Sequence, residues 1–421
     1  MRPLVTLVVL AVLLLPTLPA HGASLPAAKP EEVGLSSAAL ARIGATLRAD
    51  VEAGRIPGAV VVVARRGRIA YSEALGFRDK AAGAPMKADA IFRIASMTKP
   101  MVSVAAMMLY EEGRLMLGDP VKTYIPAIGE MRVAVMDADG QTLQSTVPVT
   151  RPMTIQDLLR HTSGLTYGNR GTSAAHKLYP ESSSRISRAV TAAEFIDRLG
   201  KAPLLFQPGT KWEYSFSTDV LGRVVEVVSG KNLGQFLDER IFRPLKMADT
   251  GFVVPAAKRD RLAQALANDP DTGKPQELID VTVPPKFECG GGCVVSTAGD
   301  YVRFAQMLLN RGSLDGARLL GRKTVEYMTA DHLAPGVTGF SNYIPGPGYG
   351  FGLGVAVRRD PGVADSNGSP GDYSWGGAFG TYFWVDPKEQ LVVVSMTQAP
   401  GPIRVHYRHL LKALVYQALN D

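Results

Sequence analysis

A serine and a lysine stand three positions apart in the segment FRIASMTKP, as Ser96 and Lys99. The apolar sequence that follows predicts a helix from Ser96 to about Glu112, and positions three apart on a helix lie on nearly the same face. A serine hydroxyl is a weak nucleophile until a base takes its proton, and a buried lysine can be that base because desolvation disfavours its charged form. The pair therefore predicts a nucleophilic serine with a lysine partner.

The setting of this pair distinguishes it from a chance Ser-x-x-Lys. Apolar residues, among them Met101, Val102 and Leu109, occupy almost every side of the predicted helix. Such a helix is buried inside its protein, where a lysine without a partner would be costly. The alternative is a serine that only caps the helix and a lysine on the surface, and two further segments argue against it.

Those two segments follow the Ser-x-x-Lys segment, one after the other along the chain. Tyr214 lies in PGTKWEYS, before a predicted helix, and Trp375 lies in SWGGAFGT, before a predicted strand. Together with the Ser-x-x-Lys segment they make the chain resemble the serine β-lactamases, the D,D-peptidases and their esterase relatives. Further matching segments, which extend the resemblance over nearly the whole chain after residue 23, are LLRHTSGL (158–165), GGGCVVSTA (290–298) and YGFGLG (349–354).

The resemblance implies an acyl-enzyme mechanism and the residues that perform it. Ser96 would attack the substrate carbonyl, while Lys99 and Tyr214 would share the removal of its proton. The backbone N–H groups of Ser96 and Ala378 would form the oxyanion hole, and Gly377 would let the backbone approach the substrate closely. The resemblance implies neither a metal nor an organic cofactor.

Two departures from the family's motifs bear on the substrate. Phe216 replaces the asparagine of Tyr-x-Asn, and Trp375-Gly376-Gly377 replaces Lys-Thr-Gly. In penicillin-recognising relatives the lysine and asparagine help to hold the carboxylate and amide of the lactam. The replacements favour apolar acyl or alcohol groups, and Trp-Gly-Gly resembles the family VIII carboxylesterases. We therefore predict an esterase of short-chain substrates with weak β-lactam hydrolysis, in which Phe216, Trp375, Gly376 and Gly377 bind the substrate.

Other functions stay open at this stage. The order of the motifs also permits a class C type β-lactamase or a D,D-carboxypeptidase, and a transesterase of the same fold is a further alternative. A catalytically inactive binding protein is disfavoured because Ser96, Lys99 and Tyr214 are all present. No Gly-x-Ser-x-Gly and no His-Glu-x-x-His occurs, which argues against an α/β-hydrolase and a zinc protease. His161, in LLRHTSGL, is expected to be structural.

The N-terminus and the cysteines concern the compartment. Residues 1–23 contain Arg2, an apolar run and then small residues, the pattern of a cleaved signal peptide, so we expect a periplasmic or secreted protein. No other segment is long and apolar enough to cross a membrane. In an oxidising compartment Cys289 and Cys293, separated by three glycines, can form a disulfide. Two reduced thiols are the alternative.

Composition and periodicity outline the architecture. The net charge is +7, but lysines and arginines are scattered, so we expect a small ester or β-lactam as ligand and no nucleic acid. Predicted strands near both ends and helices between them, with the resemblance, indicate an α+β protein of the β-lactamase/D,D-peptidase-like fold. Its α/β lobe, with a central antiparallel sheet from both chain ends, would take residues about 30–120 and 340–421, and an inserted helical lobe about 121–339. The expected strands comprise residues 59–64, 69–75, 349–357, 380–385 and 391–396.

Overall fold

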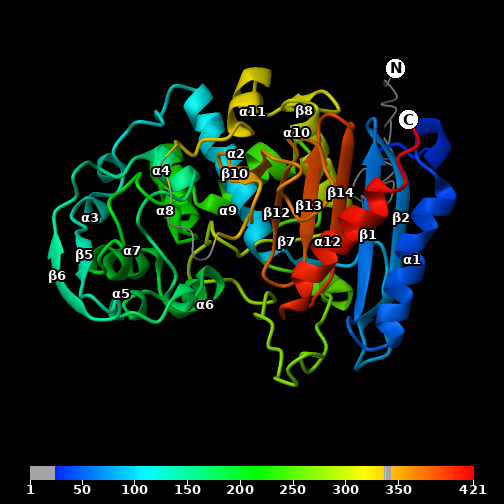
Figure 1. Ribbon diagram of the computed structural model, residues 1–421, viewed down its shortest axis with the longest axis horizontal. Coiled ribbons are helices and arrows are strands. Elements are labelled where there is room, and N and C mark those ends of the chain that lie inside the picture. The colour runs from blue at the N-terminus through cyan, green and yellow to red at the C-terminus, as the bar shows by residue number, and fades with distance from the viewer. Residues whose placement is uncertain (1–23, 336, 338–342) are drawn as a thin grey trace, which may run out of the picture.

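The sheet at the centre of the protein is built from both ends of the chain. The computed structural model describes residues 24–335, 337 and 343–421, so the predicted signal peptide lies outside the described residues. An eight-stranded antiparallel sheet has the order β10-β11-β12-β13-β14-β1-β2-β3 (Figure 1). Its strands are β1 (Gly58–Arg65), β2 (Arg68–Asp79), β3 (Ala84–Pro85), β10 (Tyr349–Phe351), β11 (Ala356–Arg358), β12 (Tyr373–Gly376), β13 (Tyr382–Asp386) and β14 (Leu391–Met396).

Strand β1 joins the two ends of the chain. Val62 of β1 lies opposite Val394 of β14 on one side and Ser72 of β2 on the other. Every residue of β1 is buried, as its unbroken apolar sequence predicts for a strand covered on both faces. The sheet confirms the predicted fold class.

Helices cover both faces of the sheet and form two cores. Val60 and Val62 belong to the core that contains α2 and α10, whereas Val61 and Val63 belong to the core that contains α1 and α12. This alternation follows from the period of two along a strand. Figure 1 shows α12 crossing one face of the sheet. The four helices are α1 (Ser37–Glu52), α2 (Thr98–Glu111), α10 (Ala298–Leu309) and α12 (Ile403–Tyr416).

Shorter elements from the middle of the chain lie beside the sheet, mostly on the left of Figure 1. The β5–β6 hairpin was not foreseen from the sequence. No helix in the described part of the chain has the length and apolar character that a membrane span needs. These elements include α3 (Pro126–Gly129), α4 (Ile155–Leu159), α5 (Ala174–Lys177), α6 (Ser183–Ala189), α7 (Ala192–Lys201), α8 (Ser217–Ser229), α9 (Leu233–Leu237), α11 (Arg322–Met328), β5 (Val133–Met136), β6 (Leu143–Val147), β8 (Ser313–Leu314) and β9 (Ala317–Arg318).

The strands β10, β11 and β12, at one edge of the sheet, differ from the sequence prediction. The run expected as one strand at residues 349–357 divides into the paired strands β10 and β11. Between them Gly354 takes φ +98°, a left-handed conformation that ends a strand. Strand β12 was not predicted as a strand, because its glycine and the loop residues around it weaken the pattern. It nevertheless carries Trp375 and Gly376 at the edge of the functional site.

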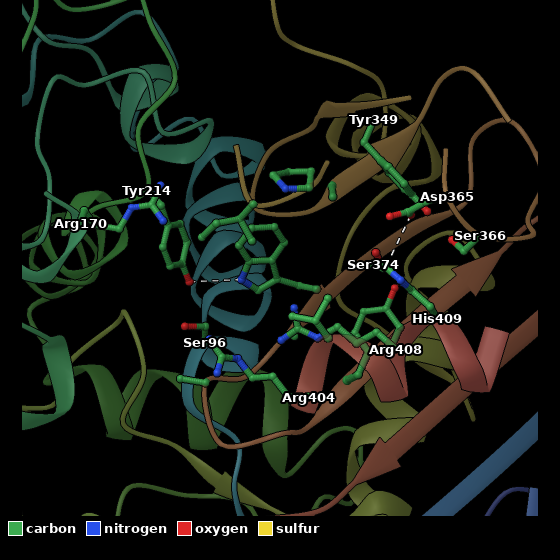
Figure 2. A pocket seen from close by; sticks show the side chains of 18 residues that line it. Ser96, Arg170, Tyr214, Tyr349, Asp365, Ser366, Ser374, Arg404, Arg408 and His409 are labelled. Carbon is green, nitrogen blue, oxygen red and sulfur yellow. Dashed lines mark hydrogen bonds and ion pairs between the residues drawn. The ribbon is translucent and has the colours of Figure 1, made fainter. Parts of the chain in front are cut away.

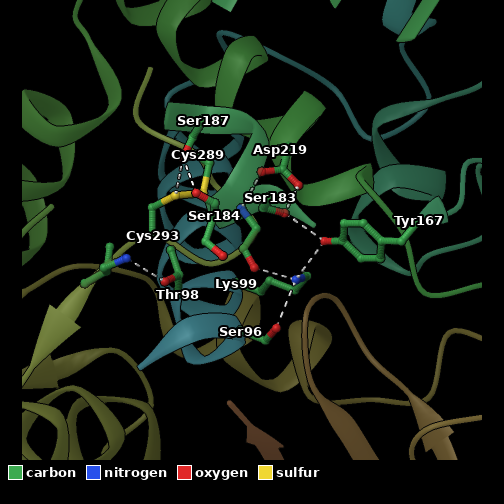
Figure 3. The surroundings of a disulfide bond; sticks show 12 residues. Ser96, Thr98, Lys99, Tyr167, Ser183, Ser184, Ser187, Asp219, Cys289 and Cys293 are labelled. Atoms are coloured by element: carbon green, nitrogen blue, oxygen red, sulfur yellow. Dashed lines mark hydrogen bonds between the residues drawn. A yellow bond between two sulfur atoms is a disulfide. The ribbon is translucent and has the colours of Figure 1, made fainter. Parts of the chain in front are cut away.

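A short strand pair brings the cysteines next to the start of α2. Strand β4 (Phe92–Arg93) pairs with β7 (Val295–Ser296), directly after the cysteine segment. Cys289 and Cys293 are joined by a disulfide across the three glycines (Figure 3). A Cβ on Gly290 would lie 2.3 Å from a backbone oxygen of α8, so only glycine permits this close approach. The loop is thereby held against both α2 and α8.

Removal of the disulfide tests its contribution to stability. The loop spans a sequence separation of only 4 residues, and closing so small a ring restricts the unfolded chain by about 2 kcal/mol. We expect the double variant Cys289→Ala/Cys293→Ala to lose about that much unfolding free energy in urea titrations, since both residues are buried. A variant as stable as the oxidised wild-type protein would contradict this, and the reduced wild-type protein is the control.

Candidate active site

Ser96 lies in a tight turn immediately before α2. It is the middle residue of a 3-10 turn (Ala95–Met97), and it lines a cavity. Ala95 has φ +44°, a left-handed conformation that costs a residue with a side chain on the order of 1–3 kcal/mol. The hydrogen bond from the Ile94 N–H to the Val294 carbonyl oxygen, 3.2 Å long, helps to hold this turn against the disulfide loop. Strain of this kind concentrates at functional sites.

The amine of Lys99 is buried, yet each of its donors has an acceptor. The side chain is 1% exposed. Its Nζ donates to Ser96 Oγ at 3.4 Å, to the Tyr167 hydroxyl at 3.3 Å and to the Gly291 carbonyl oxygen at 2.6 Å (Figure 3). An ammonium group has three N–H donors, so the three contacts satisfy it. The structure thus places the predicted nucleophile and the predicted lysine side by side.

A chain of hydrogen bonds leads from Lys99 to a buried carboxylate. The Tyr167 hydroxyl lies 3.0 Å from Ser183 Oγ, which donates to Asp219 Oδ2 at 2.7 Å. Asp219 Oδ1 accepts the N–H of Gly291 at 2.9 Å. The peptide at Gly291 therefore binds Asp219 through its N–H and Lys99 through its carbonyl oxygen. A Cβ at Gly291 would lie 2.3 Å from Asp219 Oδ2, so a larger residue would disrupt this arrangement.

The Lys99 charge stabilises the Asp219 carboxylate at the end of this chain. Burial raises the pKa of Asp219 to about 6, and the Lys99 charge, the Ser183 hydroxyl and the Gly291 N–H oppose that rise. The hydrogen bonds of this chain therefore connect the Asp219 carboxylate with the Lys99 amine. Burial and the Asp219 charge raise the pKa of Tyr167 well above its usual value, so its hydroxyl keeps its proton and can relay a hydrogen bond.

Tyr214 completes the predicted catalytic group at the same cavity. Lys99 Nζ lies 4.4 Å from the centroid of the Tyr214 ring. The Tyr214 hydroxyl accepts a hydrogen bond from Trp375 Nε1 at 3.4 Å, the dashed line in Figure 2. Tyr214, Ser96 and Trp375 all line the cavity. The structure therefore brings Ser96, Lys99 and Tyr214 together from the start of α2 and from the segment before α8.

His161 supports Tyr214 and does not reach the cavity. Its ring is 1% exposed and lies 4.9 Å from the Tyr214 ring, centroid to centroid. Its Nδ1 is 3.2 Å from Ser215 Oγ. Burial, and then the Lys99 charge, lower the pKa of His161 well below its usual value, so the ring is neutral. These contacts fit the structural role expected from the sequence.

The cavity beside Ser96 is open enough for a small ester. Its volume is about 360 Å³, within the range of small-molecule sites. Trp375 and Gly376 of β12 line it together with Arg404 and Arg408 of α12. Figure 2 shows Arg404 on the side of Ser96 and Arg408 below Ser374 in that view. The sheet and the last helix thus form the side of the cavity that faces the helical part of the chain.

Two backbone N–H groups at the cavity donate no hydrogen bond within the described part of the protein. Ser96 and Ala378 both line the cavity. Within the described residues, neither backbone N–H donates a hydrogen bond to another protein group. A Cβ on Gly377 would lie 2.4 Å from the Ile94 carbonyl oxygen, so glycine lets β12 end close to the nucleophile turn. Such free amides can bind a developing oxyanion.

Two of the predicted substrate-binding residues lie elsewhere than expected. Phe216 is fully buried, with its ring 4.4 Å from that of Tyr167 and 5.3 Å from that of Phe195, and it does not line the cavity. The prediction for Phe216 needs correction, because its side chain packs in the core under Tyr167. Gly377 is also absent from the lining, and its N–H bonds to the Thr381 carbonyl oxygen at 2.7 Å, so it supports the site from behind.

The structure also shows site residues that sequence reasoning missed. Tyr167 and Ser183 lie in loops or short helices with no periodic pattern, so no sequence signal marked them. Asp219 lies in the first turn of α8, where in the sequence it resembles an ordinary first-turn carboxylate. Arg404 and Arg408 stand four apart on the last helix, where the sequence suggests only a solvated face.

Fold and site together define a serine hydrolase of the β-lactamase fold. Ser96 and Tyr214 line one cavity, and the buried amine of Lys99 contacts Ser96 Oγ and the Tyr214 ring. The comparison with known families agrees. The family model described as Beta-lactamase matches residues 43–417, and the chain belongs to that family.

Individual relatives include proteins named as esterases. Protein Rv1367c of Mycobacterium tuberculosis (strain ATCC 25618 / H37Rv) is 37% identical over 362 residues, which cover 84% of this chain and 88% of that protein. Esterase EstB of Burkholderia gladioli is 32% identical over 410 residues, 91% of this chain and 98% of that protein. The solved structure of EstCE1, "a hydrolase with promiscuous acyltransferase activity", has a TM-score of 0.74 at 30% identity and covers 90% of this chain and 99% of that chain. The resemblance identified from the sequence is confirmed.

Replacement of the buried carboxylate tests the chain from Lys99 to Asp219. Asp219→Asn keeps the shape and removes the charge, so we expect kcat on an ester substrate to fall about ten- to a hundredfold through misplacement of Lys99. The pH–rate profile should also lose the inflection that Asp219, with its pKa raised to about 6, contributes, because the amide does not titrate. Both are measured by steady-state kinetics between about pH 5 and 9.

The thermal stability of Asp219→Asn distinguishes a role of Asp219 in positioning Lys99 from a merely structural role. The folded-state pKa of Asp219, about 6, exceeds its unfolded value of 3.8, so the folded protein binds more protons in that window and its stability falls as pH rises through it. At neutral pH Asp219→Asn should therefore unfold at no lower temperature than the wild-type protein. Asp300→Asn is the matched control, since burial also raises the pKa of Asp300 to about 6, but its carboxylate bonds to Thr250. An equal change of the pH profile in both variants would contradict the prediction.

Proposed function

We propose that the protein is a carboxylesterase that hydrolyses small carboxylic esters through an acyl-enzyme on Ser96. The observation that carries the proposal is the contact between Ser96 Oγ and a buried Lys99 Nζ, 3.4 Å apart, at a cavity that Tyr214 also lines. Similarity to EstB and EstCE1 supports ester chemistry. The cavity volume of about 360 Å³ supports a small substrate.

The first half of the reaction forms the acyl-enzyme. Ser96 Oγ, 3.4 Å from Lys99 Nζ, loses its proton to the Lys99–Tyr214 pair as it attacks the carbonyl carbon of the ester. The carbonyl oxygen becomes an oxyanion, which the free N–H groups of Ser96 and Ala378 bind. The C–O bond to the alcohol then breaks, and Tyr214 gives the alcohol its proton.

The second half releases the acid. A water molecule in the place of the alcohol loses its proton to the same pair and attacks the acyl carbon. The tetrahedral intermediate collapses, the bond to Ser96 Oγ breaks, and Ser96 recovers a proton. The Asp219–Ser183–Tyr167 chain holds Lys99 in position through both halves. Side chains and backbone amides of this chain perform each of these steps.

A second candidate is transfer of the acyl group to an alcohol instead of water. Similarity to EstCE1, which is described as a hydrolase with promiscuous acyltransferase activity, supports it. Efficient β-lactam hydrolysis is less well supported, because the lysine and threonine of Lys-Thr-Gly are replaced by Trp375 and Gly376. We further propose that the protein acts in the periplasm or outside the cell, as the predicted signal peptide and the disulfide suggest.

Removal of the nucleophile tests the proposed reaction. We expect Ser96→Ala to lower kcat on p-nitrophenyl butyrate by at least about a thousandfold, because the variant lacks the hydroxyl that Lys99 contacts and that would carry the acyl group. Circular dichroism should show a folded variant, and a fluorophosphonate probe should label the wild-type protein alone. Retained esterase activity or retained labelling would overturn the assignment.

A substrate comparison separates the candidates. The wild-type protein should show a higher kcat/KM on p-nitrophenyl butyrate than on nitrocefin, since the similarity to EstB and EstCE1 supports ester chemistry. A much higher value on nitrocefin would favour a β-lactamase. Addition of an alcohol acceptor and analysis of the products by chromatography measure transesterification against hydrolysis.

A further inference from the structure

The cavity beside the nucleophile carries more positive charge than a neutral ester requires. Three arginines and one aspartate line it. Of these, Arg170 is paired with Glu213 at 3.0 Å, and Asp365 is paired with His409 at 3.5 Å. Arg170 and Asp365 therefore each have a partner side chain. The other two arginines, both from α12, need a separate account.

Arg404 and Arg408 have no carboxylate partner among the residues that the structure describes. Arg404 donates to the carbonyl oxygens of Pro400 and Gly401, at 2.7 and 2.8 Å. Arg408 donates to the Gly377 carbonyl oxygen at 3.2 Å. Each guanidinium carries a full charge that only neutral oxygens offset, next to a cavity that opens on Ser96.

Of these two arginines, Arg408 has the less complete set of hydrogen bonds. Its Nε is buried and donates to no acceptor within the described chain. Its guanidinium carbon lies 5.5 Å from the centroid of the Tyr382 ring. Burial lowers the pKa of Arg408, and the neighbouring Arg404 lowers it further. Two desolvated like charges at one cavity are costly unless something with the opposite charge binds there.

The sequence of β12 makes room for this guanidinium. A Cβ on Gly376 would lie 2.5 Å from one terminal nitrogen of Arg408 and 2.6 Å from its guanidinium carbon. Any larger residue at position 376 would therefore push the Arg408 side chain away from its place behind β12. The glycine at the position of the family's threonine thus leaves the space that the arginine from α12 occupies.

We propose that Arg408, supported by Arg404, forms an anion-binding subsite, and that the ester cleaved at Ser96 carries a carboxylate near its scissile bond. The proposal rests on the proposed esterase function and deepens it by naming the class of substrate. A carboxylate would accept charge-assisted hydrogen bonds from the planar guanidinium of Arg408. It would supply the negative charge that the cavity lacks. The purely apolar substrate favoured by the sequence loses one of its two supports, since Phe216 does not line the cavity.

Two matched pairs of esters test the proposal on the intact protein. The mono-p-nitrophenyl ester of adipic acid and p-nitrophenyl hexanoate differ by a carboxylate on the acyl side. The acetate ester of 3-hydroxybenzoic acid and phenyl acetate differ by a carboxylate on the alcohol side. For each pair, the ratio of kcat/KM on the anionic ester to that on the neutral ester is measured for the wild-type protein and for Arg408→Gln, Arg408→Lys and Arg198→Gln.

The proposal expects a wild-type ratio above one in at least one pair. Arg408→Gln should lower that ratio at least about tenfold, the scale of a hydrogen bond to a charged group. Arg408→Lys should lower it less, since the charge remains. Arg198→Gln removes the same charge from an exposed position on α7 and should leave the ratio unchanged. A merely structural role of Arg408 would lower both values of kcat/KM and leave their ratio as it was.

Several outcomes would overturn the proposal. An unchanged ratio in folded Arg408→Gln would do so, as would an equal fall in Arg198→Gln. If Arg408→Gln does not fold, the wild-type ratios decide, because a preference for the neutral ester in both pairs contradicts the proposal. Hydrolysis of the neutral esters in that case leaves the esterase function standing. Absence of hydrolysis of all four esters contradicts the esterase function, and the subsite proposal fails with it.

Discussion

Burial of the Lys99 amine governs how the active site is assembled. A lysine at 1% exposure on a helix that is apolar all round needs a partner for every N–H. Ser96 Oγ is one of its three acceptors, so the hydrogen bond that satisfies the lysine also positions Ser96. The other two, Tyr167 and Gly291, come from distant parts of the chain. Folding of α2 into the core therefore requires that the helical part and the disulfide loop close around it.

The disulfide loop connects this lysine to the second charge of the site. Gly291 bonds Lys99 through its carbonyl oxygen and Asp219 through its N–H, so one peptide holds a cation and an anion at fixed places. Three glycines allow the loop to touch α8, and the Cys289–Cys293 disulfide limits the conformations that they would otherwise permit. The glycines let the backbone reach this position, and the disulfide helps to keep the Gly291 peptide there.

The opposite side of the cavity follows a similar logic with glycine and arginine. Gly377 lets β12 end against the nucleophile turn, and Gly376 leaves space for the guanidinium of Arg408. The charged residues on this side, Arg404 and Arg408, come from α12, a helix that packs mainly on the other face of the sheet. Ser96 thus contacts the Lys99 amine from α2 and shares its cavity with the arginines from α12.

Residue patterns alone were enough to predict the buried strand β1, the apolar helix α2 and the pair Ser96 and Lys99, while Tyr214 was predicted from the resemblance to the family. Each of these is encoded within a few residues, or by a motif order shared with the family. The pattern did not predict that Tyr167, Ser183 and Asp219 reach Lys99, or that Phe216 lies in the core and Arg408 at the cavity. Those relations depend on long-range packing, in which residues far apart in sequence compete for the same space and the same hydrogen bonds, and no local periodicity records the result.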